Sequence, residues 1–227
     1  MGQAIYLSAD DHERISAAVS QAENNTAGEI VTVLADRSDD YNDVQLAWSA
    51  LAALLKLLGF ALLPALPLTV AGALLGDWNT EWHAQGIFVL ASFAAALAFA
   101  VVWLIQQWDA VRFAVIPGPI RDTRVHNRAL RAFRLSAERR TSGRTGILIY
   151  VSMREHRAEI IADQAIAEKV EPDVWGDALH ALLQEVKQGR TAEGMIAAIG
   201  KVGAVLSEHL PIASDDYNEL PDRLIEV

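Results

Sequence analysis

The stretch GILIYVSMREHRAEIIAD, residues 146–163, decides the fold of this chain. Its first part, GILIYVS (146–152), is a nearly continuous apolar run, which is typical of a central strand covered on at least one face. MREH (153–156) then leads into RAEIIAD (157–163), which we interpret as a second strand hairpinned to the first. A third strand, EIVTVLA (29–35), is rich in β-branched residues and lies far upstream.

The most apolar part of the chain lies between these strands. IFVLASFAAALAFAVVWLI (87–105) contains no charged residue. An uncharged apolar run of about 18 residues or more predicts a membrane-spanning helix. We place this span at about 86–107.

Another span is expected before it, at about 54–75. Pro64 and Pro67 should bend this apolar segment. Lys56 lies near its start, where a long cationic side chain can reach the headgroups. The short polar connection GDWNTEWHAQ (76–85) makes the two spans a helical hairpin.

We therefore predict an α/β fold, in which a small central sheet with helices is interrupted after its first strand by a transmembrane helical hairpin. The expected divisions are 1–42 for the first part of the domain, 43–108 for the hairpin, 109–210 for the second part, and 211–227 for an acidic C-terminal tail. Because residues 1–42 cannot form a domain alone, their strand should pair with the strands after residue 145.

The charges predict an orientation in the membrane. The connection between the spans holds Asp77 and Glu81 but no Lys or Arg, whereas the segment 108–146 holds nine arginines. The positive-inside rule then places both termini and the folded domain in the cytoplasm. The N-terminal residues lack the apolar core of a cleavable signal sequence. The net charge of −10 argues against nucleic acid as a partner.

Several segments resemble the TPM domain family. They are GEIVTVLADRSDDY (28–41), RVHNRALRAF (124–133) and RTGILIYVSMREHRAEIIADQAI (144–166), and the closing YNELPDRLIEV (217–227) is similar to the tail of bacterial two-span members. The resemblance implies a TPM-like fold. Some members of the family are described as acid phosphatases or calcium binders, and they use an acidic segment with Asn-Asn-Gly just before the central strand.

This chain departs from that pattern at SGRTG (142–146), where Arg144 and Thr145 replace the Asn pair. A guanidinium group there would repel a cation, although it can hold a phosphate. The departure weakens the inference of metal binding and of catalysis.

The candidate metal ligands are Asp36, Asp39, Asp40 and Asp163. Asp36, Ser38 and Asp40 start like a calcium loop, but Tyr41 and Ala47 stand where an EF-hand needs Gly and Glu. We expect no cofactor. The alternative is that the four carboxylates gather at the edge of the sheet and hold Ca²⁺ or another divalent metal.

The arginines form a second candidate site. Arg121, Arg124, Arg128 and Arg131 lie within about 80° of one another on a helix. Such a face can contact anionic lipid headgroups or a partner protein. The alternative is a solvated face paired with the acidic tail.

Small residues are expected where the spans pack. Gly72 and Gly76 can meet Ala91 and Ala95 of the other span. The same residues can instead join two copies of the chain in a homodimer.

Two functions follow from these observations. The first is a non-catalytic binding or assembly module, anchored in the bilayer, with an unknown membrane protein partner. The alternative is a membrane-bound, metal-dependent acid phosphatase.

Overall fold

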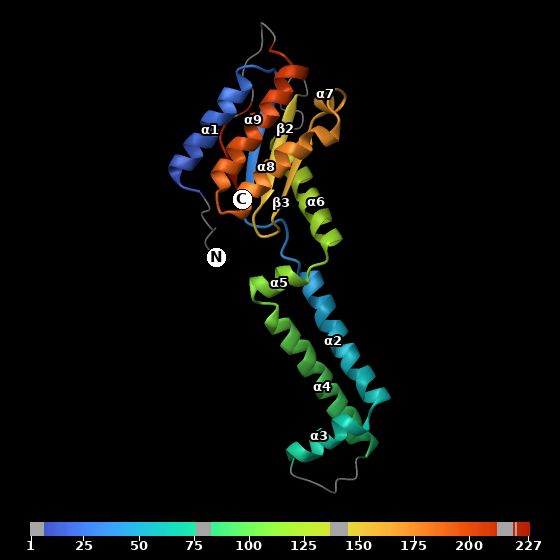
Figure 1. The fold of residues 1–227 in the computed structure, drawn as a ribbon. Coiled ribbons are helices and arrows are strands. Elements are labelled where there is room, and N and C mark those ends of the chain that lie inside the picture. The colour runs from blue at the N-terminus through green and yellow to red at the C-terminus, as the bar shows by residue number, and fades with distance from the viewer. Residues whose placement is uncertain (1–6, 76–82, 137–144, 213–219, 221) are drawn as a thin grey trace. The chain divides into compact units, whose positions relative to one another are not determined.

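The computed structural model describes residues 7–75, 83–136, 145–212, 220 and 222–227 (Figure 1). The chain divides into two compact units. One unit combines residues 1–39 with 117–227, and the other consists of residues 40–116. We call them the sheet unit and the hairpin unit.

The sheet unit is built on four strands in the order β3-β2-β1-β4. β1 (Glu29–Ala35) pairs in parallel with β2 (Gly146–Ser152) along its whole length. β3 (Arg157–Ala162) returns antiparallel to β2. These pairings confirm that the strand at 29–35 joins the strands after residue 145, and that 146–163 forms a β-hairpin.

The fourth strand, β4 (Ile225–Glu226), pairs in parallel with β1. The residues around it are tied to the end of β1, because the Val227 amide donates to the Leu34 oxygen at 2.9 Å and the Asp36 amide donates to the Val227 oxygen at 3.0 Å. The expected acidic tail therefore ends as an edge strand. Two residues are too few to show strand periodicity in a sequence.

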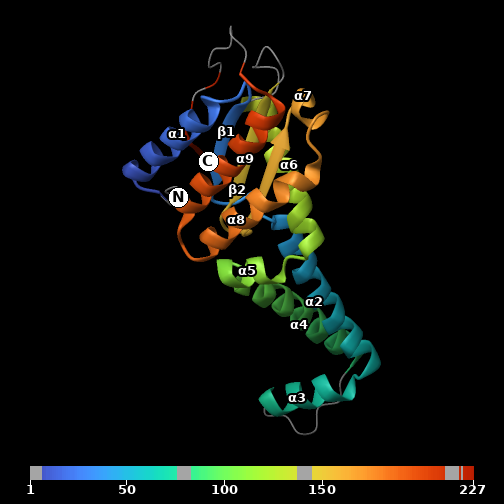
Figure 2. The ribbon, with the colours of Figure 1, turned by 45° about the horizontal axis from the view of Figure 1, so that its top comes forward.

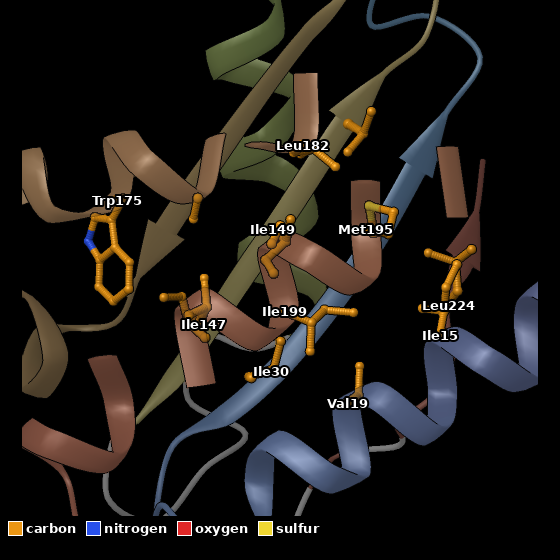
Figure 3. Close-up of a cluster of buried hydrophobic side chains, with 14 of the residues drawn as sticks. Ile15, Val19, Ile30, Ile147, Ile149, Trp175, Leu182, Met195, Ile199 and Leu224 are labelled. Atoms are coloured by element: carbon orange, nitrogen blue, oxygen red, sulfur yellow. The ribbon is translucent and has the colours of Figure 1, made fainter. Parts of the chain in front are cut away.

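Three helices cover one face of the sheet: α1 (Ala9–Glu23), α8 (Gly176–Lys187) and α9 (Thr191–His209) (Figure 2). Two short elements, α7 (Gln164–Ala167) and the 3₁₀ helix η1 (Pro172–Trp175), lead from β3 to α8. The core on this face is the larger of the two. Figure 3 shows Ile15 and Val19 of α1, Ile30 of β1, Ile147 and Ile149 of β2, Leu182 of α8, and Met195 and Ile199 of α9 meeting there.

The opposite face is packed against α6 (Gly118–Ser136). Strand residues alternate between the faces, so neighbours of the first core residues point to the second core. The second core contains Val31, Val33, Leu148 and Tyr150 from the strands and Val125, Ala129 and Phe133 from α6. The buried residues of α6 are four positions apart, which is the spacing of an amphipathic helix with one buried face.

The hairpin unit contains α2 (Asn42–Leu62), α3 (Ala65–Leu75), α4 (Ala84–Ile105) and α5 (Asp109–Val115). Of the helices in the described part of the chain, α2 and α4 are long and apolar enough to cross a membrane. The prediction of one helix over about 54–75 is wrong. The chain leaves the helix at Leu63, because the residue before a proline disfavours the α conformation, and it starts α3 after Pro64.

This break changes the position of Lys56. Lys56 lies six residues before the end of α2 at Leu62 rather than near the start of an apolar helix. Its exposed side chain is about 9 Å from that end, at 1.5 Å per residue.

Polar side chains fasten α2 to α4. The side-chain amide nitrogen of Gln106, the C-cap of α4, lies 3.3 Å from both the Gln45 carbonyl oxygen and the Ser49 hydroxyl. All three residues are buried. Because a hydrogen bond inside an apolar environment is not exchanged with water, these contacts favour one register between the helices.

The prediction that small residues lie where the two apolar helices pack can be compared with the structure only in part. Ala91 and Ala95 of α4 are buried, whereas Gly72 is half-buried and belongs to α3. Gly76 lies outside the described residues.

Candidate functional site at the carboxyl ends of the parallel strands

The two parallel strands end side by side, at Ala35 of β1 and Ser152 of β2. In open α/β sheets, ligands bind preferentially beyond the carboxyl ends of the strands. Here the chain that follows β1 supplies Asp36, Ser38 and Asp39, and the turn after β2 supplies Glu155. Polar side chains therefore gather at the edge of the sheet where a ligand-binding site is expected.

A buried polar network occupies the edge. The Ser38 amide donates to one Glu155 carboxylate oxygen at 2.9 Å, and the Ser152 hydroxyl donates to the other at 2.5 Å. The Ser38 hydroxyl donates to the Ser152 oxygen at 2.8 Å and lies 3.1 Å from the Tyr150 hydroxyl. Glu155, Ser152 and Tyr150 are fully enclosed. The network therefore holds the loop after β1 against the turn after β2, and it offers no group to solvent.

The aspartates after β1 are held by arginines. The two oxygens of Asp36 accept from Arg37 at 3.2 Å and from Arg154 at 3.1 Å. Asp39 accepts from Arg124 of α6 at 3.1 Å. These ion pairs neutralise the carboxylates that the sequence suggests as metal ligands.

Asp163 lies at the other end of the sheet. Its amide donates to the Gly146 oxygen at 2.8 Å, beside the first residue of β2. Gly146 is six residues before the end of β2 at Ser152, so Asp163 lies about 20 Å from that end, at 3.3 Å per residue. The register therefore corrects the expected grouping of Asp163 with Asp36 or Asp39. Asp163 instead caps α7 by accepting from the Gln164 amide at 2.7 Å.

In the described part of the chain, the four candidate carboxylates do not come together as one group. Calcium takes 6–8 oxygen ligands. Within the described ranges, no group of three or more His, Asp or Glu side chains is placed to hold a metal. Asp40 belongs to the hairpin unit, and Asp36 and Asp39 already face guanidinium groups. Residues 142–144 of the SGRTG segment lie outside the described residues.

The arginine face of α6 divides into two halves. Arg121 is half-buried, and Arg124 forms the ion pair with Asp39. Arg128 and Arg131 are exposed, and they line a groove of about 290 Å³ beside Tyr150. We call it the α6 groove. Its other lining residues are Val33, Ala132, Leu135, Ser136, Ile225 and Val227.

The chemistry of Tyr150 follows from its surroundings. Burial raises the pKa of its phenol, while the hydrogen bond to Ser38 and the positive charge of Arg128 oppose this shift. Burial prevails, so the side chain remains a neutral hydroxyl at physiological pH.

Sequence reasoning identifies the arginines and the aspartates but misses the Ser38–Glu155 network and the α6 groove. The serines and Glu155 carry no motif, because hydroxyl and carboxylate groups in short turns are common on any protein surface. The groove depends on Ile225 and Val227, and therefore on β4, which the sequence does not predict.

Comparison with known proteins agrees with this architecture. Residues 110–205 match the family model described as TPM domain. The matched segment runs from α5 through α6, β2, β3 and α8 into α9. No curated protein sequence matches the chain.

One solved structure is similar over nearly the whole chain. It is the NMR structure of BA42 protein from the psychrophilic bacterium Bizionia argentinensis, with a TM-score of 0.56 and 20% identity, over 98% of this chain and 97% of that one. At this identity the likeness concerns the fold. The family match shows that the chain carries a TPM domain over residues 110–205, and the structural likeness agrees with it in fold.

Proposed function

We propose that this protein is a membrane-anchored TPM domain, which acts as a non-catalytic binding or assembly module at the cytoplasmic face of a bacterial inner membrane. The anchor is the hairpin unit, and the binding part is the sheet unit. The orientation rests on the arginines that follow α4 and on the lack of Lys and Arg between the spans.

The observation that carries this proposal is the outward-facing apolar surface of α2 and α4. Leu54 and Leu62 of α2 are 62% and 70% exposed, and Phe88 and Phe93 of α4 are 73% and 67% exposed. Large apolar side chains exposed along whole helices indicate a surface that an apolar medium or a partner covers. Because both helices have the length of a span, a bilayer is the medium we propose.

The binding role is supported by the state of the polar groups in the sheet unit. Asp36 and Asp39 are paired with arginines, and Glu155 is buried among hydroxyl groups. By contrast, Arg128 and Arg131 are exposed beside a groove. Cationic groups at an open groove suit recognition of an anionic ligand.

The alternative is a metal-dependent phosphatase that uses the aspartates after β1. It requires the Arg154 and Arg124 ion pairs to open so that Asp36 and Asp39 can hold a metal. We expect the purified full-length protein not to hydrolyse p-nitrophenyl phosphate, with or without Ca²⁺, Mg²⁺ or Mn²⁺.

The matched control is a variant in which Asp36, Asp39 and Asp40 are replaced by Asn. Metal-dependent turnover in the native protein that disappears in this variant contradicts the non-catalytic role. Turnover that the native protein and the variant share does not use these three aspartates.

A further inference from the structure

The α6 groove arises from the way one helix covers the second face of the sheet. α6 packs along β3 and β2, and the side chains of Val33 on β1 and Ile225 on β4 line the space beside it. The wall on the helix side is made by Arg128, Arg131, Ala132 and Leu135, which lie within two turns. Leu135 is 74% exposed, so an apolar side chain stands at the rim.

Two guanidinium groups border this apolar groove, and no described acidic side chain is paired with them. In the described part of the chain, Arg128 and Arg131 form neither a hydrogen bond nor an ion pair. Other arginines of the sheet unit do: Arg124 pairs with Asp39, Arg154 with Asp36, and Arg157 with Asp122. The chain has 29 acidic residues against 19 basic ones, so the lack of a partner is not due to a shortage of carboxylates.

We propose that the α6 groove binds a single-chain anionic amphiphile, with its alkyl chain on Val33, Leu135 and Ile225 and its headgroup between Arg128 and Arg131. This inference rests on the proposed binding function and names the ligand class. It does not depend on whether the hairpin unit spans a membrane.

The dimensions and the chemistry of the groove favour this class of ligand. A volume of about 290 Å³ is at the lower limit of ligand pockets, which suits one alkyl chain better than two. Two guanidinium groups one turn apart can donate to the oxygens of one phosphate or carboxylate. An anion without a chain leaves the apolar lining exposed, and an alcohol without a charge leaves both guanidinium groups unpaired.

The test is photolabelling of the full-length protein in zwitterionic nanodiscs with decyl phosphate that carries a diazirine near the end of its chain. We expect adducts on the segments 131–136 and 225–227, in addition to labelling of the hairpin unit from within the bilayer. Unlabelled decyl phosphate should suppress the groove adducts, whereas decanol or inorganic phosphate at the same concentration should not.

The decisive variant is Arg128→Gln with Arg131→Gln, in which the groove adducts should fall about ten-fold. Lys187→Gln with Lys201→Gln removes the same charge from exposed positions on α8 and α9, over the other face, and should leave the adducts unchanged. Adducts confined to α2–α4, or groove adducts that persist in the arginine variant, would overturn the proposal. If a second copy of the chain or a partner protein fills the groove, the adducts should be confined to α2–α4.

Membrane anchoring is tested separately, by labelling positions on the two sides of the membrane. The proposed ligand of the groove and the proposed membrane anchor can therefore fail independently.

Discussion

At the residue scale, Glu23 is a partly buried carboxyl group whose ionisation affects folding. It closes α1, and one of its carboxyl oxygens accepts from the Ile30 amide of β1 at 2.7 Å. Burial raises the pKa of Glu23 from 4.5 to about 8, and the nearby carboxylates of Glu29 and Asp222 act in the same direction. The Ile30 hydrogen bond opposes the shift. Glu23 is therefore protonated in the folded protein at neutral pH.

This raised pKa makes the stability depend on pH. Between pH 4.5 and about 8 the unfolded chain loses a proton that the folded protein retains. The free energy of unfolding therefore falls as the pH rises through this window, and it is highest at or below the unfolded value. The direction is opposite to that of a salt-bridged carboxylate.

The variant Glu23→Gln tests this effect, because the amide keeps an oxygen for the Ile30 amide and cannot ionise. We expect it to match the native protein at pH 5 and to be more stable at pH 8.5, by about 1–3 kcal/mol after allowance for partial exposure to solvent. Pulse proteolysis in urea measures the difference. Glu13→Gln, at an exposed position of α1, is the control and should show no such change. A constant difference between the Glu23 variant and the native protein at both pH values would refute the assignment.

Single residues also show where sequence reasoning stops. The stripe Val125, Ala129 and Phe133 is visible in the sequence, since four-residue spacing on a helix fixes one face. The ion pair between Arg124 and Asp39 is not visible, because it joins residues 85 positions apart. Its existence depends on how α6 lies on the sheet, and only the packed structure determines that.

At the element scale, the contact between α1 and α9 depends on a glycine. A Cβ atom at Gly203 would lie 2.7 Å from the Ala22 Cβ and 3.3 Å from its Cα. At Gly200, one turn earlier on the same helix, a Cβ atom would meet nothing within 4 Å. The two glycines therefore have different roles.

We expect Gly203→Ala to destabilise the sheet unit by about 1–3 kcal/mol, because the methyl group forces α9 away from α1. Gly200→Ala should instead be neutral or stabilise by up to about 1 kcal/mol, since alanine is the better helix former. Thermal unfolding of the full-length variants measures both changes. If the two substitutions lower the melting temperature equally, the close approach of the helices does not exist.

Elements differ in how far the sequence predicts them. β1, β2 and β3 are long enough to show apolar runs, and their predicted limits agree with the structure within a residue. The sequence predicts the first long apolar helix at the wrong place, because the apolar composition continues through Pro64 while the helix ends before it. β4 escapes prediction because its two residues are held by the hydrogen bonds of β1, which no local signal encodes.

At the scale of the whole molecule, the parallel pairing of β1 with β2 requires a long crossover connection. Here the crossover contains the entire hairpin unit and α6. The sheet unit therefore cannot be completed until both α2 and α4 have been made and β2 has followed them. If α2 and α4 both span the bilayer, the chain returns after α4 to the side of the membrane on which β1 lies.

The most direct test of this account is the sidedness of two introduced cysteines, because the chain has none of its own. His83→Cys lies at the start of α4, and Lys201→Cys lies on α9 of the sheet unit; both positions are exposed. We expect a membrane-impermeant maleimide to label position 83 in intact spheroplasts, and to label position 201 only after the membrane is permeabilised. Labelling of both positions in intact spheroplasts would contradict a hairpin that crosses the bilayer twice, and labelling of position 201 alone would contradict the cytoplasmic placement of the sheet unit.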